Sequence, residues 1–344
     1  MSSEMFVSTS LRILVNVESL NAVETVGNVS RHRVAPIVIP QDAGYTIKYV
    51  PAVSGESIGH GYQSVLADIA LREGLPVGEF SARKEFLKYS GDSYLEGISP
   101  PSNHDDIRRF EVDVLLKDVV ADVGGFLYTG KISVKRTSRL QVGYLLPALE
   151  DVTNAAAVEA QFHVRYLASQ EQKREKTGDE TRLGQAIYNI EAASALYTMT
   201  LNLDLSGVGV PSTQFGKKHE KERQLESQVP KRRAAALKAL ATLLGQISFG
   251  GKHARYLPNT ELMSCVFTVS ETPFTVTPGN FRNYIQRTSE RLRKLSSILN
   301  SKNMVWAVIR EKNLDITPEV KIVQNTEDIV AELIERLRQN GLVA

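Results

Sequence analysis

The stretch that decides the fold is VPAVSGESIGHGYQSVLADIALR, residues 50–72. It opens as the end of a strand and turns at Ser54-Gly55, where the Ser54 hydroxyl is suited to cap the first turn of a helix. Glu56 then places a carboxylate in that turn, where the helix dipole favours negative charge. Apolar residues recur behind it at helical spacing: Ile58, Tyr62, Val65, Leu66 and Ile69. The stretch therefore predicts a strand, a tight turn and an amphipathic helix.

A second stripe on the same helix is small and polar: Ser57, His60, Gly61 and Ser64. Gly59 and Gly61 lie inside the helix, where glycine costs about 1 kcal/mol relative to alanine. A close approach to this backbone would offset that cost. Two explanations stay open: tight packing of another element, or a polyanion backbone lying at the helix N-terminus, whose free amides suit phosphate. His60 likewise has two explanations: it is a buried core histidine, or it contacts the polyanion.

Three segments carry a resemblance to a known family. They are VNVESLNAVETVGNVSRHRVAPIV at 15–38, SGESIGHGYQ at 54–63 and FGGKHARYLP at 249–258. With them the chain resembles, over nearly its whole length, the archaeal DevR family, the CRISPR-associated backbone subunits of type I-A Cascade in the RAMP superfamily. The resemblance implies an α+β fold with a ferredoxin-like, RRM-related core (a palm) and large insertions. The palm would bind CRISPR RNA and stack into a filament along it.

The same resemblance implies the partners. They are CRISPR RNA, further copies of the chain in a helical filament, and other Cascade subunits that include a small partner of the DevS type. Target DNA would pair transiently with the guide RNA, and a helicase-nuclease would act downstream. No cofactor and no metal are implied.

Composition places the chain among ordinary globular proteins, with 344 residues, 42% apolar and 23% charged. One cysteine, Cys265, rules out a disulfide framework or a cysteine-based zinc site within one chain. The longest apolar runs fall short of the ~20 residues that a membrane helix needs. The first residues, MSSEMFVSTS, lack the pattern of a signal peptide. We therefore expect a cytoplasmic protein.

The net charge of +2 does not by itself indicate a nucleic-acid binder. Basic residues nevertheless gather in short groups: Arg31-His32-Arg33, Lys135-Arg136-Arg139, Lys217-Lys218-His219, Lys231-Arg232-Arg233 and Lys252-His253-Arg255. Local basic patches on a mixed surface suit a protein that holds a polyanion on one face. They suit an ordinary solvated surface almost as well.

The order of predicted elements divides the chain into five parts. We predict the first part of the RRM-like core at 1–73, an insertion subdomain at 74–150, core strands at 151–206, an exposed loop or arm at 207–230, and a core helix, glycine-rich loop, strand and C-terminal elements at 231–344. Within the insertion, 110–116 and 133–140 look like short strands. At the N-terminus, 11–18 alternates like a half-buried strand.

Residues 158–166, VEAQFHVRY, alternate clearly and predict a strand. Its polar side presents Gln161, His163 and Arg165 in a row. An open sheet face of this kind can hydrogen-bond bases or phosphates.

The glycine-rich loop follows a predicted helix and precedes a predicted strand. Gly250 and Gly251 would let backbone amides approach phosphate, and Lys252 and Arg255 would neutralise it. The order resembles the glycine loop of RAMP proteins. A bare Gly-Gly is more often only a turn.

A coating protein needs amides, hydroxyls and cations spread along one surface, and such contacts are independent of sequence. The candidate RNA-binding residues are Asn16, Asn21, Arg31, Arg33, Ser54, Gly55, Ser57, His60, Gln63, His163, Arg165, Gly250, Gly251, Lys252 and Arg255. Each also has a structural explanation without RNA. Arg31 and Arg33 can be solvent-exposed charges at a turn, and Asn21 can cap a turn.

Catalysis is the alternative. A histidine at 60, 163 or 253 suits general acid–base work, so an endoribonuclease that processes CRISPR transcripts stays open. However, no histidine stands at a local sequence spacing that would pair it with a nucleophile or with another histidine. Asp118 and Asp122 would share a face only in a helix, and the valine-rich segment around them predicts a strand. We therefore predict a protein without catalytic activity.

A third hypothesis is purely architectural. Head-to-tail contacts that do not close produce helical filaments. The insertion and the predicted arm are natural contact pieces, and Lys135, Arg136 and Arg139 could face a neighbouring subunit. We expect RNA binding and self-association together.

Overall fold

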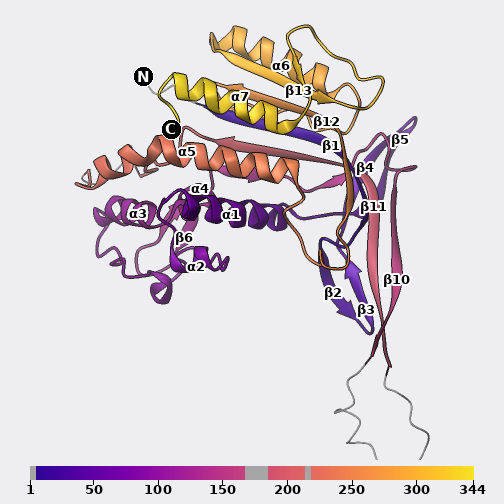
Figure 1. Cartoon of the computed structure of the whole chain (residues 1–344), viewed down its shortest axis with the longest axis horizontal. Helices are drawn as coiled ribbons and strands as arrows, with labels where there is room; N and C mark the ends of the chain where they lie inside the picture. The colour runs from indigo at the N-terminus through magenta and orange to yellow at the C-terminus, as the bar shows by residue number, and fades with distance from the viewer. Residues whose placement is uncertain (1–4, 167–184, 214–217) are drawn as a thin grey trace, which may run out of the picture.

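The computed structural model describes residues 5–166, 185–213 and 218–344, and it is a mixed α/β fold (Figure 1). Its elements are β1 (Phe6–Glu18), β2 (Ala22–Val26), β3 (Val29–His32), β4 (Val34–Gln41), β5 (Gly44–Pro51), α1 (Gly55–Arg72), α2 (Glu79–Ala82), η1 (Asp92–Tyr94), α3 (Asp106–Lys117), α4 (Val119–Gly124), β6 (Phe126–Tyr128), β7 (Val134–Arg136), β8 (Leu140–Val142), β9 (Leu146–Pro147), β10 (Ala156–Tyr166), β11 (Gln185–Asp204), α5 (Glu222–Gly245), β12 (Asn259–Ser270), α6 (Tyr284–Leu299), β13 (Asn303–Ile309), β14 (Lys321–Val323) and α7 (Thr326–Gln339).

One large sheet organises these elements. Its strand order is β14-β13-β12-β1-β11-β3-β2, and β10, β8 and β9 pair with the other edge of β11. β1 lies between β12 and β11 and is antiparallel to both. β10 pairs antiparallel with the first half of β11. The central four strands therefore stand in the order β12-β1-β11-β10.

Helices α1, α5 and α7 cover one face of this sheet, while α6 packs on the other (Figure 1). The predicted helix after Ser54 is confirmed: Ser54 is its N-cap and accepts a hydrogen bond from Ser57 N. Ile58, Tyr62 and Leu66 are fully buried, as the apolar spacing predicts. Tyr62 also donates its hydroxyl to the carbonyl of Ala236 in α5 at 2.9 Å.

β1 is more deeply buried than its alternation predicts. Its polar side faces residues 271–283, which cross the sheet as a strap. Ser8 Oγ accepts a hydrogen bond from Val276 N, and Ser10 Oγ accepts one from Gly279 N, each at 3.0 Å. Arg12, fully buried, donates to the carbonyl of Gly279 at 2.9 Å. The face that an open RRM-type sheet would offer to RNA is closed here at its centre.

The insertion differs from the sequence prediction. Residues 110–116 form part of helix α3 instead of a strand, and 119–124 are helical as well. The alternation in FEVDVLL is real, but Glu111 turns inward to an arginine, so a polar residue occupies a buried helix position. The predicted strand at 133–140 is only β7 and the first residue of β8.

The predicted exposed arm at 207–230 is also corrected. Helix α5 begins at Glu222 and passes through Pro230, which the sequence suggests as a boundary. Pro230 leaves the carbonyl of Glu226 without a helical donor, and Glu226 is exposed, so water can satisfy it. Leu225 is buried in the apolar cluster of the insertion, and Val208 is buried in the main core. Residues 214–217 lie outside the described part.

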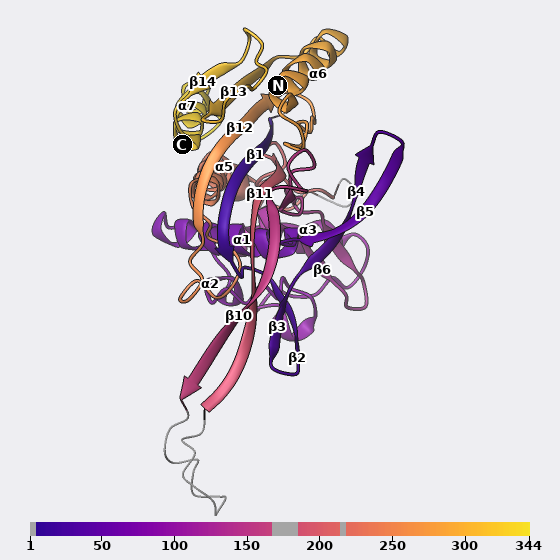
Figure 2. The same ribbon diagram turned by 90° about the vertical axis from the view of Figure 1, so that its right-hand side faces the viewer.

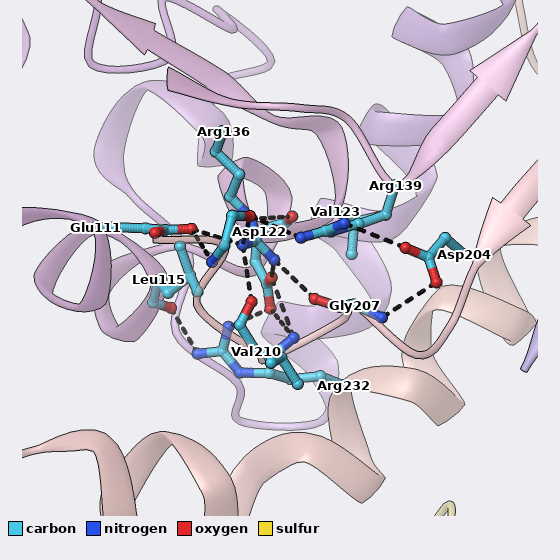
Figure 3. Close-up of polar contacts among 12 residues, drawn as sticks. Glu111, Leu115, Asp122, Val123, Arg136, Arg139, Asp204, Gly207, Val210 and Arg232 are labelled. Atoms are coloured by element: carbon cyan, nitrogen blue, oxygen red, sulfur yellow. Dashed lines mark hydrogen bonds and ion pairs between the residues drawn. The ribbon is translucent and has the colours of Figure 1, made fainter. Parts of the chain in front are cut away.

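A buried ion network joins the insertion to α5 (Figure 3). Asp122 pairs with Arg136 at 2.5 Å and with Arg232 at 2.8 Å, and Arg136 also pairs with Glu111 at 2.9 Å. All four side chains are fully buried. Two of the basic groups in the sequence are therefore partly internal, and these arginines are not available to a polyanion.

In the described part of the chain, no helix has both the length and the apolar character needed to cross a membrane.

Candidate nucleic-acid interface

Four segments meet at one end of the molecule. They are the start of α1, the β2–β3 hairpin, the long β10–β11 hairpin and the loop at 246–258 between α5 and β12 (Figures 1 and 2). β3 pairs with β11 in parallel at Asn189 and Ile190, which holds the two hairpins side by side. Most of the predicted contact residues lie on these segments. We call this region the α1 end.

Asn21 ties the α1 end together. Its side-chain Oδ1 accepts hydrogen bonds from Arg33 Nε and from the backbone amide of Ser54, each at 2.9 Å. Its backbone carbonyl accepts from Arg33 N at 2.8 Å. Asn21 and Arg33 therefore position the helix, which is a structural use of two predicted contact residues. Within the described residues, the first-turn amides of Gly55 and Glu56 are left without a side-chain cap.

The glycine-rich loop docks directly on the residue before Asn21. Gly251 N donates to the carbonyl of Leu20 at 2.8 Å, so this amide is already used. Gly250 has a φ of +83°, and a side chain there would collide with Leu20. The turn alone thus requires Gly250. A role of either glycine toward RNA stays a prediction.

Lys252 is the cation that the loop leaves unpaired. It adopts a φ of +61°, which is uncommon for a side chain other than glycine. Its Nζ is shielded from solvent and has no hydrogen-bond partner among the described residues. Burial, and after it the charge of Arg255, lower the pKa of Lys252. An anionic ligand would satisfy this ammonium and reverse the shift.

A cluster of aromatic rings extends this surface onto the β10–β11 hairpin. The ring of His163 stacks on Tyr188 with centroids 5.3 Å apart, and its Nε2 is hydrogen-bonded to the hydroxyl of Tyr256. Arg255 Nη1 donates to the Tyr188 hydroxyl at 2.6 Å. His163 and Arg255, distant in sequence, are thus brought together. We call these four residues the aromatic cluster.

Two members of the aromatic cluster, Tyr188 and Tyr256, are absent from the sequence-predicted set. A signal was available, because Tyr256 directly follows Arg255 in KHARY, and interleaved basic and aromatic residues are typical of surfaces that stack bases. Nothing in the local pattern of β11 distinguishes Tyr188 from a strand residue that packs in a core.

The glycines of α1 are explained by packing. A side chain at Gly61 would overlap Phe249 of the glycine-rich loop, and one at Gly55 would strike the carbonyl of Val142. Gly59, by contrast, has no atom within 4 Å of the place where a Cβ would stand. The close approach that the sequence requires is therefore protein packing at Gly61 and Gly55.

The remaining candidates divide by exposure. Asn16 is exposed at the end of β1, and Arg31 lies 3.7 Å from Glu191 on the neighbouring strand. The backbone amide of Ser57 donates to Ser54 Oγ in the cap of α1, and the residue is half-buried. The side chain of Arg165 lies outside the described part, although its backbone pairs within β10.

His60 and Gln63 lie toward the insertion instead of the loop. His60 is exposed, with its ring edge on Phe86 at 4.9 Å between centroids. Gln63 is buried and donates to the carbonyl of Gly59 at 2.9 Å, while its Oε1 points at Gly124 in α4. Direct RNA contact by Gln63 does not fit this position.

A buried histidine–carboxylate pair supports the β2–β3 hairpin. His32 Nε2 lies 2.7 Å from Glu18 Oε1, and both side chains are fully buried. Tyr197 and the amide of Leu20 also donate to Glu18. Burial lowers the pKa of His32, but the hydrogen bond and charge of Glu18 outweigh it, so the pKa lies above its ordinary 6.5.

The candidate catalytic groups do not form a constellation. Asp118 caps the short helix α4 and Asp122 lies within it, contrary to the predicted strand, but both are buried. Asp118 accepts from Ser81 Oγ at 2.6 Å, and Asp122 is held by two arginines. Among the described residues, no group of three or more histidine, cysteine or carboxylate side chains is placed to hold a metal ion.

Comparisons with known proteins agree on one group. A family model described as CRISPR-associated negative auto-regulator DevR/Csa2 matches residues 9–289. The CRISPR-associated aCascade subunit Cas7/Csa2 2 of Saccharolobus solfataricus is 46% identical over 331 residues, covering 96% of this chain and 99% of that protein. The CRISPR-associated protein Cas7/Csa2 1 of the same organism is 38% identical over 306 residues, covering 88% and 92%.

Solved structures give a likeness of fold. A chain of a CRISPR RNA-guided surveillance complex aligns with a TM-score of 0.50 at 11% identity, covering 96% of this chain and 99% of that one. A chain of such a complex described as pre-nicking gives 0.51 at 12% identity. At these identities the likeness supports the architecture alone.

Proposed function

The chain belongs to the DevR/Csa2 family of CRISPR-associated proteins, and from this premise we propose that it is a non-catalytic backbone subunit of a type I-A Cascade complex. It would coat CRISPR RNA and present the guide for pairing with invading DNA in antiviral defence. One observation carries the proposal: Lys252, shielded and without a hydrogen-bond partner among the described residues, lies in the same loop as Arg255 and Tyr256 of the aromatic cluster, at the α1 end. An RNA-coating subunit of this kind would work in the cytoplasm.

We further propose that the core is a ferredoxin-like, RRM-related palm. The order β12-β1-β11-β10, with α1 after β1 and α5 after β11, is that of two βαβ halves folded into one antiparallel sheet. Because the strap at 271–283 closes the centre of the open face, the RNA would follow the α1 end instead of crossing the sheet.

The chemistry of the α1 end suits a backbone-directed contact. Lys252 and Arg31 supply cations, the amides of Gly55 and Glu56 supply donors, and Tyr188 offers a ring on which a base can stack. Glu56 places an opposing carboxylate in the same turn, so the cations have to outweigh it. None of these groups reads a base edge, which suits a protein that coats many guides.

Self-association is proposed through the β4–β5 hairpin, which projects from the body (Figure 2) and contacts β10 through β5. One of its faces exposes apolar side chains: Val34, Val38, Tyr45, Ile47 and Tyr49. The other face packs inward through Ile37 and Ile39. A second copy is the occupant that the proposed filament supplies, and other Cascade subunits, a DevS-type partner among them, would join the filament.

The open edge of this hairpin is blocked against strand addition. The backbone amide of Ala52 donates to the carbonyl of Arg33 at 3.0 Å. Arg33 and every second residue after it in β4 therefore form the hydrogen-bonded pairs of this hairpin. Pro36 and Pro40 then fall at the outward positions, where proline removes the donors that another strand would need. The contact with a neighbour would be made by the face and its side chains.

RNA binding against salt tests the proposed function. Labelled CRISPR RNA is titrated with the wild type and with a His60→Ala/Lys252→Ala/Arg255→Ala variant, and its length is checked after incubation. We expect steep salt dependence, a weaker slope in the variant and intact RNA. A matched control, Lys117→Ala/Arg223→Ala, removes the same two positive charges, since histidine counts as neutral, from exposed side chains in elements away from the α1 end.

Three other outcomes would change the proposal. Shortened RNA that depends on His60 would support the endoribonuclease alternative. Equal losses in the variant and its control would mean that net charge, and not the α1 end, binds RNA. A folded wild type that binds no RNA would leave a purely architectural subunit.

A further inference from the structure

Helix α6 carries an exposed line of cations on the sheet face opposite to α1, α5 and α7 (Figure 1). Arg287, Arg291 and Lys294 stand at i, i+4 and i+7, which places them on one side of the helix. All three are exposed, while Ile285 and Leu292 on the other side are buried. We call these three residues the α6 line.

The α6 line lacks the carboxylate partners that its neighbours have. Arg282 pairs with Glu150 at 2.6 Å, and Arg293 pairs with Glu319 at 3.3 Å. No ion pair joins a residue of the α6 line to a carboxylate within the described residues. Glu290, the single acidic residue of α6, is engaged by Gln286 at 3.0 Å. In a chain with a net charge of only +2, this local excess is not a consequence of composition.

Arg291 is held in place before any ligand arrives. Its guanidinium lies 5.1 Å above the ring of Phe274, and its Nη1 donates to Thr277 Oγ1 at 3.0 Å. Both partners belong to the strap at 271–283. A fixed guanidinium loses less side-chain entropy on binding an anion than a mobile one does.

A polar groove borders the same strap. It has a volume of about 480 Å³ and reaches Phe274 and Thr275 on the strap side. Hydroxyl and amide groups line it, from Thr137, Ser138, Gln141 and Ser206, together with the ion pair of Arg139 and Asp204. Donors of this kind suit phosphate and sugar oxygens. The groove and the α6 line thus adjoin through Phe274.

We propose that the α6 line and this groove form a second binding surface for a single-stranded phosphodiester backbone, separate from the α1 end. Successive members of the line rise by about 4.5–6 Å, so they present a linear row of charge. An acidic protein helix is a poorer fit, because such a partner needs an apolar seam, and this side of α6 offers only Ile298, exposed beyond Lys294 at the end of the line. In a complex that opens DNA to pair one strand with a guide RNA, the other DNA strand needs such a surface. This role rests on the proposed function, whereas the binding of a single strand by the α6 line does not.

The test uses full-length protein that is loaded with unlabelled RNA and then separated from free RNA, so that the α1 end is occupied and no excess RNA competes for the α6 line. Labelled single-stranded DNA that cannot pair with the RNA is then titrated at several salt concentrations. For Arg287→Gln/Arg291→Gln/Lys294→Gln we expect affinity to fall at least about tenfold at low salt. The log–log salt slope should shrink by about 2, because each phosphate contact of a single strand contributes about 0.7. RNA affinity should not change.

The control is Lys117→Gln/Arg223→Gln/Lys231→Gln, which removes the same charge from exposed positions elsewhere. Unchanged DNA binding in the α6 variant would overturn the proposal, as would an equal loss in the control or the absence of DNA binding by the RNA-saturated wild type. Labelled RNA and duplex DNA, run as separate arms, identify which backbone is preferred. Failure of the proposed function shows separately, as RNA affinity that does not respond to variants of the α1 end.

Discussion

The side-chain oxygen of Asn21 accepts a hydrogen bond from the backbone amide of Ser54 at 2.9 Å, across 33 residues of sequence. The amide belongs to the N-cap of α1, and the asparagine also binds Arg33 at the end of the β2–β3 hairpin. One small side chain therefore fixes the start of the helix relative to the hairpin.

Replacing Asn21 by alanine should loosen this joint. Two partly buried donors lose their acceptor, and we expect the free energy of unfolding to fall by about 1–3 kcal/mol. RNA affinity should fall as well, because the cations of the hairpin and the start of α1 would no longer be held together. Urea unfolding and RNA titration below the transition measure the two effects.

Asn28→Ala is the matched control, because Asn28 is exposed at the hairpin turn. It should change stability by less than about 0.5 kcal/mol. If Asn21→Ala were as mild as this control, the hydrogen bond from Ser54 would be dispensable and α1 would be positioned by packing alone.

The two loop glycines should respond differently to alanine. Gly250→Ala forces a side chain into a left-handed backbone and against Leu20, so we expect a loss of about 1–3 kcal/mol of stability. Gly251→Ala meets nothing closer than 3.9 Å and should be nearly neutral. Thermal unfolding of the pair checks this. Equal destabilisation would mean that the loop has another conformation in solution.

The glycine loop also shows how far the sequence could predict this site. Helical spacing and the cap at Ser54 correctly predict α1, because both signals are local. The packing of Phe249 on Gly61 depends on residues 188 positions apart, so the sequence left packing and polyanion contact as open alternatives. The aromatic cluster was missed in part for the same reason: no local pattern brings Tyr188 to His163.

The errors in the insertion have a related cause. In FEVDVLL, apolar and acidic residues alternate as in a strand, yet Glu111 is buried against Arg136, a partner that only the tertiary structure supplies. Pro230 is a normal boundary signal, but apolar packing of Leu225 extends α5 beyond it. Tertiary contacts outweigh local propensity at both places.

The buried ion network should be costly to break. Asp122→Ala leaves the guanidinium groups of Arg136 and Arg232 buried without their shared carboxylate, and we expect a loss of about 3–5 kcal/mol in the free energy of unfolding. Glu335→Ala removes an exposed pair with Arg338 and should cost less than about 1 kcal/mol. Similar losses in the two variants, measured by urea unfolding, would contradict the structural role of the network.

His32 should make stability depend on pH. Both ring nitrogens face acceptors, Glu18 Oε1 and the carbonyl of Arg33, so the doubly protonated imidazolium is favoured. The pKa of His32 in the folded chain lies above its ordinary 6.5, so the contribution is complete below 6.5. It is lost as pH rises through the folded value.

The measurement is the free energy of unfolding of the wild type and of His32→Gln from acidic to alkaline pH. The difference between them should be largest on the acid side and shrink above neutrality. Glu191, which accepts from His32 N, and Tyr197, which donates to Glu18, stay in place in both proteins. A difference that grows with pH would show that His32 is neutral in the folded chain.

The exposed face of the β4–β5 hairpin should control assembly. Ile47 is 67% exposed between Tyr45 and Tyr49, and a charge there would have to be buried in any contact with a second copy. We expect Ile47→Asp to reduce self-association on long RNA by at least about tenfold, because the charge costs energy only in the assembled state.

Thr46→Asp adds the same charge to the opposite face of the same strand, also at an exposed position, and should assemble normally. Sedimentation of each variant on RNA of increasing length separates the outcomes. Filaments that grow equally with all three proteins would place the contact elsewhere, whereas loss of monomer binding to short RNA by Ile47→Asp alone would assign this face to RNA.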